Sequence, residues 1–315
     1  MAGLPRDEVI DWLMAGDVAI QYQTSRDLLD EERPDLRARI ATEGWGARFL
    51  AAQNHDGSWG RGYYMPKWTS SHYTLLDLRN LGIDPQTPAI RDSILSILER
   101  EKRSDGGMGP GASIANSDVC VAGMVLNYAS YFGMPEALLT SVVDFLLREK
   151  MPDGGFNCRS NRSAPHHSSL HSTISVLEGF EQFLGAGYSW RATEIGDAMA
   201  SSREFMLMHR LFRSDHTGAV IHPDFLRFPY PFRWKYNILR ALDHWVLAHA
   251  PYDARLQEAL DRVIAARRPD GRWTVNAAHA GDQHFVMEKA GQPSRWITLI
   301  ALRVLRADAF RLRSR

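Results

Sequence analysis

The two cysteines are the residues whose chemistry is easiest to narrow down. Cys120 and Cys158 are the only thiols in a sequence of 315 residues. Two thiols are too few for a disulfide framework, so we expect a cytoplasmic protein in a reducing environment. A free thiol there is either a quiet core residue or a group that reacts or binds a metal. Composition alone leaves both alternatives open.

The overall charge excludes two classes of partner. Lys plus Arg and Asp plus Glu both number 37, so the formal net charge is zero. Nucleic acid and anionic membrane surfaces require a large basic excess. The N-terminal stretch lacks the basic start and apolar core of a signal peptide, and no apolar run reaches the length of a membrane span. We therefore expect a small-molecule substrate, no nucleic acid and no integral membrane segment.

A short phrase that contains Asp-Gly recurs along the chain. Its aspartates are Asp56, Asp105, Asp153 and Asp270, and a weaker copy lies at Asp215. The successive differences are 49, 48, 62 and 55 residues. Repeats of this length are typical of architectures in which one supersecondary unit is stacked many times.

Amphipathic helices are predicted before the phrases, as at residues 90–103 and 136–150, and Asp-Gly ends each helix. More apolar helices are predicted after the phrases, at residues 69–81, 118–132, 172–184, 234–247 and 295–305. Two N-terminal helices, at residues 7–14 and 18–30, complete six hairpins. We predict an all-α fold over residues 1–315 as a single domain. A closed (α/α)6 toroid, with the second helices around a central cavity and their N-terminal ends at one mouth, fits better than an open solenoid.

Two motifs carry a family resemblance. Residues 46–53 followed by Gly57-Ser58-Trp59 resemble the QW repeat of squalene and oxidosqualene cyclases. The Asp-Gly-Gly-Phe turn at residues 153–156 resembles the repeats of protein prenyltransferase β subunits. As a whole, the sequence resembles bacterial squalene-cyclase-like or prenyltransferase-like proteins. The resemblance implies the α/α toroid, an apolar central cavity and an isoprenoid or lipid-like substrate.

The acid motifs of terpene cyclisation are missing. Neither the Asp-x-Asp-Asp motif that protonates an alkene nor the Asp-Asp-x-x-Asp motif of ionising synthases occurs in the sequence. The QW-like phrases therefore indicate architecture rather than cyclisation chemistry.

Prenyltransferase β subunits bind zinc through Asp-x-Cys at the start of one inner helix and a His at the start of a later one. The matching positions are Asp118, Cys120 and His171. The resemblance implies that these three are catalytic zinc ligands, with one position open for a substrate thiol. Cys158 departs from the family pattern, and is either a fourth ligand that closes the site or a thiol on its rim. The alternative for the set is a helix cap, a buried thiol and a hydrogen-bonded core histidine.

A second group of residues is expected to bind substrate. Arg159 and Arg162 resemble the basic segment that faces the diphosphate in the same family, and the guanidinium fork suits phosphate oxygens. The Tyr that follows the zinc Cys in the family is Val121 here. The remaining candidates are ring-bearing side chains near the mouth or on inner helices: His72, Trp234, Tyr236 and Trp296. Such rings favour an isoprenoid or a developing cation, but they also simply fill cores.

Other charged groups near the predicted mouth have weaker assignments. Arg233, Lys235 and Arg295 lie at inner-helix starts, where anions bind, or are ordinary surface charges. His284 and Glu288, in the last long loop, form a candidate acid/base pair.

Three functions remain open on the sequence. The first is a zinc-dependent prenyl or alkyl transferase, and the sequence does not say whether it needs a partner subunit. The alternative is a metal-independent terpene cyclase-like or isoprenoid-binding toroid. A third class is a toroid for carbohydrate or protein recognition. A glycosidase would need paired carboxylates across the cavity, and Asp118 and Glu178 are the candidates on the inner helices.

Overall fold

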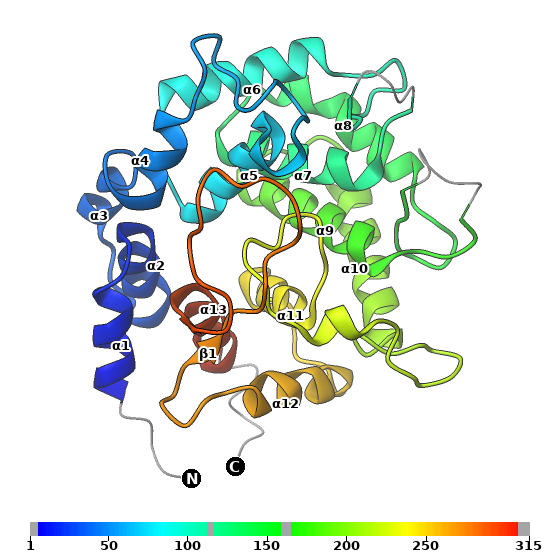
Figure 1. The fold of residues 1–315 in the computed structure, drawn as a ribbon. Coiled ribbons are helices and arrows are strands. Elements are labelled where there is room, and N and C mark those ends of the chain that lie inside the picture. Colours follow the sequence, from blue (N-terminus) through cyan, green and yellow to red (C-terminus); the bar gives the residue numbers. More distant parts are fainter. Residues whose placement is uncertain (1–5, 112–115, 159–164, 308–315) are drawn as a thin grey trace.

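The computed structural model describes residues 6–111, 116–158 and 165–307. Six helical hairpins follow one another around a ring (Figure 1). Their helices are α1 (Arg6–Met14) with α2 (Val18–Leu28); α3 (Pro34–Arg39) and α4 (Gly44–Ala51) with α5 (Ser71–Leu81); α6 (Pro88–Arg100) with α7 (Val119–Tyr131); α8 (Glu136–Arg148) with α9 (Leu170–Gly185); α10 (Ala192–Met208) with α11 (Ile238–Leu247); and α12 (Gln257–Ala265) with α13 (Arg295–Arg306). Two short strands, β1 (Trp273–Thr274) and β2 (Pro293–Ser294), pair antiparallel.

The ring is closed. The last inner helix, α13, packs against the first, α2. Arg303 on α13 pairs with Asp27 on α2 and with Asp243 on α11, and all three side chains are largely buried. The prediction of an (α/α)6 toroid is therefore confirmed, and an open solenoid is excluded.

The inner helices are buried on nearly every side, as their composition predicts. In α7 every residue from Val119 to Ser130 is buried. The outer helices bury one stripe each, as in α8, where Leu139, Val142 and Leu146 face the core. One boundary was wrong: α11 begins at Ile238, not at residue 234. The Asn237 side chain accepts a hydrogen bond from Arg240 N and caps the helix there.

The four strong Asp-Gly phrases form the same turn. In each, the backbone N–H two residues before the Asp donates to the carbonyl two residues after it: Asn54 to Ser58, Arg103 to Gly107, Met151 to Gly155 and Arg268 to Arg272. The intervening glycines have φ between +80° and +97°, a conformation that favours glycine. The Asp-Gly pair thus ends each outer helix with one fixed geometry.

Three of these turns are tied to the inner helix that follows. The backbone N–H after the turn donates to a hydroxyl in the first turn or so of that helix: Trp59 N to Ser71 Oγ, Phe156 N to Thr173 Oγ1 and Trp273 N to Thr298 Oγ1, at 2.9 to 3.0 Å. Trp59 and Trp273 also donate their indole N–H back to the end of the outer helix. Each of these three turns therefore fixes where its inner helix starts.

Two long segments lie over the N-terminal ends of the inner helices. One leads from α10 to α11, through the 3-10 helix Pro223–Leu226, and the other from β1 to β2, where it arches over the centre of the ring in orange (Figure 1). The second is held by Trp68, whose indole N–H donates to Ala280 O at 2.6 Å. No helix in the described part of the chain is long and apolar enough to cross a membrane.

The tie between turn and inner helix predicts a stability difference between two variants. Thr298 is fully buried, and its hydroxyl accepts the Trp273 N–H. Thr298→Val leaves this N–H without an acceptor and should lower the free energy of unfolding by about 1–3 kcal/mol. Thr298→Ser keeps the hydroxyl and should lose clearly less. Urea unfolding of both variants checks this, and equal losses would mean that the hydroxyl contributes nothing.

Candidate functional site at the mouth of the ring

Three of the predicted ligands converge at the start of α7. Oδ1 of Asp118 lies 3.1 Å from Cys120 Sγ and 2.6 Å from Cys158 Sγ. One donor atom from each residue lies within 4.8 Å of those of the other two. We call Asp118, Cys120 and Cys158 the thiol cluster. Asp118 also caps α7 by accepting the Cys120 N–H at 3.1 Å, so the capping interpretation is confirmed alongside the clustering.

Two glycines allow α7 and α9 to approach closely enough to form the cluster. A Cβ on Gly123 would lie 2.6 Å from Ser175 O, and one on Gly179 would lie 2.4 Å from Gly123 O. These distances leave no room for any side chain at either position. Ser172, at the start of α9, lies 3.1 Å from Cys158 Sγ. Cys158 itself lies two residues after Phe156, the residue that ties the third turn to α9.

The two thiols have different surroundings. Cys120 is buried, whereas Cys158 is partly exposed. The pKa of the Cys120 thiol is raised well above its usual range by its hydrogen bond with Cys158, by burial and by the nearby Asp118 carboxylate. Without a bound cation, therefore, Cys120 is a neutral thiol that donates to Asp118.

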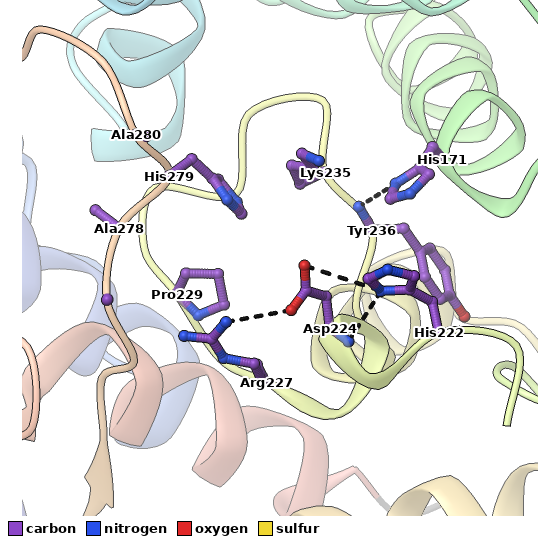
Figure 2. A pocket seen from close by; sticks show the side chains of 11 residues that line it. His171, His222, Asp224, Arg227, Pro229, Lys235, Tyr236, Ala278, His279 and Ala280 are labelled. Atoms are coloured by element: carbon purple, nitrogen blue, oxygen red, sulfur yellow. Dashed lines mark hydrogen bonds and ion pairs between the residues drawn. The ribbon is translucent and has the colours of Figure 1, made fainter.

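His171 does not join the thiol cluster. It is the second residue of α9, but its Nδ1 accepts a hydrogen bond from Tyr236 N at 2.8 Å (Figure 2). Its ring packs edge-on against Phe225 and Trp234. Among the described residues, the only group with metal-ligand geometry is the thiol cluster, without His171. The predicted set of Asp118, Cys120, His171 and Cys158 is thus assembled only in part, because the segment before α11 holds the imidazole away.

His171 lines a pocket at the same end of the ring (Figure 2). The pocket has a volume of about 340 Å³, and its other side chains include His222, Asp224, Lys235 and His279. Asp224 pairs with Arg227 at 3.2 Å and with His222 at 3.8 Å. Burial lowers the pKa of His171 to about 3 and that of His279 to about 4, so both are neutral at pH 7. No periodic pattern in the sequence indicates this pocket, because most of its walls come from two long loops.

An aromatic wall with two lysines connects the pocket to the thiol cluster. Lys67 Nζ and Lys235 Nζ lie 5.0 Å and 4.3 Å from the centre of the Trp234 ring. Neither lysine pairs with a carboxylate within 4.0 Å among the residues that the structure describes. Burial lowers the pKa of Lys67, and its like-charged neighbour Lys235 lowers it further, whereas the carboxylate of Asp118 acts in the opposite direction. Two cations therefore lie close together beside the cluster.

The predicted substrate-binding residues are distributed over different environments. Tyr236 lines the pocket that contains His171, which we call the mouth pocket. Trp234 contacts Lys67 and Lys235, and we call these three residues the lysine wall. Both positions are as expected of residues near the mouth. His72 is fully buried among Tyr63, Tyr64, Tyr73 and Tyr128, which favours the alternative of a core histidine over a substrate-binding one. Trp296 lines the central cavity rather than the mouth. Arg159 and Arg162 lie outside the described residues.

The central cavity differs from the expected apolar one. It has a volume of about 420 Å³, and five arginines and four carboxylates line it together with aromatic side chains. Tyr230 and Phe232, from the loop before α11, reach it from the mouth side. Gly82, Gly185 and Leu247 line it at the opposite side, at or just beyond the C-terminal ends of inner helices.

The remaining acidic candidates are already paired. Glu178 forms a two-fold ion pair with Arg240 at 2.7 and 2.6 Å, and this arginine lowers its pKa against the effect of burial. Glu288 accepts hydrogen bonds from Ser294 Oγ and Arg295 N at the start of α13, and His284 bonds to Thr74 Oγ1. A pair of free carboxylates, as glycosidases use, is not formed by Asp118 and Glu178.

The comparisons with known proteins concern the fold. No protein-family model and no curated protein matches this chain. Among solved structures, a polysaccharide lyase has a TM-score of 0.52 at 13% identity, over 98% of this chain and 99% of that chain. A glycosyl hydrolase of family 88 from Bacteroides vulgatus has a TM-score of 0.48 at 12% identity, over 94% and 90%. The type II terpene cyclase MstE from Scytonema has a TM-score of 0.35 at 12% identity, over 90% and 97%. At these identities the likeness to the lyase shows the shared α/α toroid fold alone.

The buried histidine predicts a pH dependence of stability. Burial lowers the pKa of His72 from 6.5 to about 3. Below pH 6.5 the unfolded chain therefore takes up a proton that the folded chain refuses, and stability falls as the pH falls from 6.5 towards 3. His72 should account for about 2 kcal/mol of the loss between pH 7 and pH 5.

Unfolding of wild type and His72→Gln at both pH values measures this contribution. The variant should lose about 2 kcal/mol less than wild type over the interval. If both proteins lose the same free energy of unfolding between pH 7 and pH 5, then His72 is protonated at pH 5 in the folded protein as well.

Proposed function

We propose that this protein is a metal-dependent transferase of the prenyl or alkyl type, with its site at the mouth of the toroid. In this proposal Asp118, Cys120 and Cys158 bind a thiophilic divalent cation, most simply zinc. The lysine wall and the mouth pocket bind the anionic part of the substrate. The observation that carries the proposal is the convergence of a carboxylate and two thiols from separate repeats on one point.

The donor set fits zinc. Thiolate and carboxylate ligands are common at zinc, and ligand atoms on one tetrahedral ion lie about 3.3–3.8 Å apart. The present separations of 2.6 and 3.1 Å are the lengths of hydrogen bonds from the two thiols to the Asp118 carboxylate. To bind zinc, both thiols must lose their protons and move slightly away from this carboxylate. Cys158 is partly exposed, which leaves a side of the cluster accessible to a substrate group.

Zinc, when bound, lowers the pKa of a thiol that coordinates it, which makes a substrate thiol a nucleophile at neutral pH. The chain's own residues supply the rest. Lys67 and Lys235, which both lie against the Trp234 ring, neutralise an anionic leaving group such as diphosphate. In the reaction the carbon–oxygen bond to diphosphate breaks, a carbon–sulfur bond forms and the thiol proton goes to solvent.

The position of the alkyl chain follows from the lining of the two cavities. Charged side chains in the central cavity would be desolvated by a long hydrocarbon, which is costly. The aromatic wall beside the thiol cluster is more favourable. Tyr64 and Trp68 each contact Tyr73 there, and the Lys67 ammonium lies 4.9 Å from the Trp68 ring. Trp68 and Tyr73 are buried, so the partly exposed rings of Tyr64 and Trp234 form the accessible surface. We therefore place an isoprenoid or lipid-like chain along this wall rather than inside the ring.

Metal analysis of purified variants tests the cation site. Wild type should bind about one zinc ion per chain, measured by elemental emission after dialysis against a zinc buffer. Cys120→Ser and Cys158→Ser should each weaken zinc binding at least tenfold, since each removes a thiolate ligand. His171→Gln, the matched control at the same mouth, should keep its zinc.

Transfer is tested separately. Incubation with geranyl diphosphate and N-acetylcysteine should yield the thioether and diphosphate, detected by mass spectrometry, and Cys158→Ser should abolish the yield. Zinc binding without any product would refute the transferase and leave the cation site standing. Full zinc occupancy in the double variant Cys120→Ser/Cys158→Ser would refute the cation site itself.

A further inference from the structure

The central cavity contains one arginine whose surroundings differ from those of the others. Arg303 pairs with Asp243 and Asp27, Arg240 with Glu178, Arg26 with Asp27, and Arg233 with Asp77. Arg79, in the last turn of α5, is the one lining arginine with no carboxylate within 4.0 Å among the described residues. It contacts amide oxygens instead: Gln182 Oε1 at 2.7 Å and Asn80 Oδ1 at 3.3 Å.

The guanidinium of Arg79 has N–H groups that donate to no acceptor in the described structure. Arginine carries five N–H groups, of which Nη1 and Nη2 use one each on the two amides, and the Nε–H has no partner. One N–H remains on each Nη, which is the arrangement that binds a carboxylate through two parallel bonds. The ring of Tyr131 lies 5.7 Å from the guanidinium carbon. Burial lowers the pKa of Arg79, so the unpaired charge is held at a cost to the fold.

The rest of the lining limits the charge of a ligand. Four carboxylates line the cavity, and the inner helices direct their C-terminal ends, with partial negative charge, to this side. A polyanion would meet repulsion from all of these groups, whereas a single negative charge is matched by Arg79. Amides of Gln23, Asn80 and Gln182 offer hydrogen bonds to uncharged polar groups. The volume of about 420 Å³ suits a small molecule.

We propose that the central cavity is a binding site for a small polar monocarboxylate, such as a sugar acid, whose carboxylate is held by the Arg79 guanidinium. The site is distinct from the thiol cluster. Arg79 lies with Tyr131 and Gly185 at the C-terminal ends of α5, α7 and α9, whereas the cluster lies at the N-terminal ends of α7 and α9. The proposal therefore does not depend on the proposed transferase.

Calorimetric titration with D-glucuronate tests the site, with D-glucose as the uncharged analogue and pyrophosphate as the polyanion. Wild type should bind glucuronate, and Arg79→Gln should bind it about ten- to a hundredfold more weakly. Arg100→Gln, which removes an exposed arginine at the end of outer helix α6, should bind like wild type. So should Cys158→Ser, which disables only the thiol cluster.

A second readout separates a ligand-binding role from a structural one. Because Arg79 is an unpaired buried charge, Arg79→Gln should melt at the same temperature as wild type without ligand, or higher. Glucuronate should raise the melting temperature of wild type and not that of the variant. The proposal is overturned if glucose binds as well as glucuronate, if pyrophosphate binds more tightly, if Arg79→Gln keeps full affinity, or if wild type binds no glucuronate at millimolar concentration.

Discussion

The hydrogen bond that joins three of the four Asp-Gly turns to the next inner helix is the constraint on which much of the ring depends. It joins the end of an outer helix to a hydroxyl near the start of an inner one, as between Trp273 N and Thr298 Oγ1. A repeat protein is stabilised mainly by contacts between neighbouring units, so an error in one hairpin would be passed to the next. With the turns fixed, the inner helices start at one level, and the last of them meets the first through Arg303 and Asp27.

The thiol cluster adjoins the one strong turn that lacks this bond. There the Asp105 carboxylate accepts hydrogen bonds from Ser117 N at 3.0 Å and Ser117 Oγ at 2.6 Å, directly before α7. Asp118 and Cys120 lie where one inner helix starts, and Cys158 lies just after the turn of the neighbouring repeat. The pair of glycines at Gly123 and Gly179 then brings the two helices closer than any other residue would permit. A site built between repeats in this way has its ligands held by the backbone, which favours a defined geometry over a flexible one.

The two ends of the ring are chemically different. The mouth holds the thiols, the lysine wall and a pocket that the neutral His171 and His279 help to line. The central cavity extends to the opposite end. Its other arginines form ion pairs with carboxylates, whereas Arg79 forms none among the described residues. Tyr230 and Phe232, from the loop before α11, line the cavity on its mouth side. A single toroid of this kind can therefore present two unrelated surfaces to small molecules.

The architecture was predictable from the sequence because it repeats. The Asp-Gly spacing located the hairpins, and the same spacing placed Asp118 and Cys120 at the mouth. The position of His171 was also correct, but its partner was not, since the ring binds a backbone N–H from a loop with no periodic signal. The pairing of arginines with carboxylates of other repeats, which leaves Arg79 unmatched, is likewise invisible without coordinates. Periodicity predicts where helices lie. Loops and ion pairs determine which side chains remain available to bind a ligand, and periodicity does not predict them.

The central claim is that the two cysteines and Asp118 bind one cation, and X-ray absorption at the zinc edge tests it most directly. The zinc-loaded protein should show two sulfur ligands at about 2.3 Å together with oxygen or nitrogen ligands at about 2.0–2.2 Å. The Cys158→Ser variant should show one sulfur at most. A spectrum of the wild-type protein with oxygen and nitrogen ligands only would place the ion elsewhere and contradict the assignment.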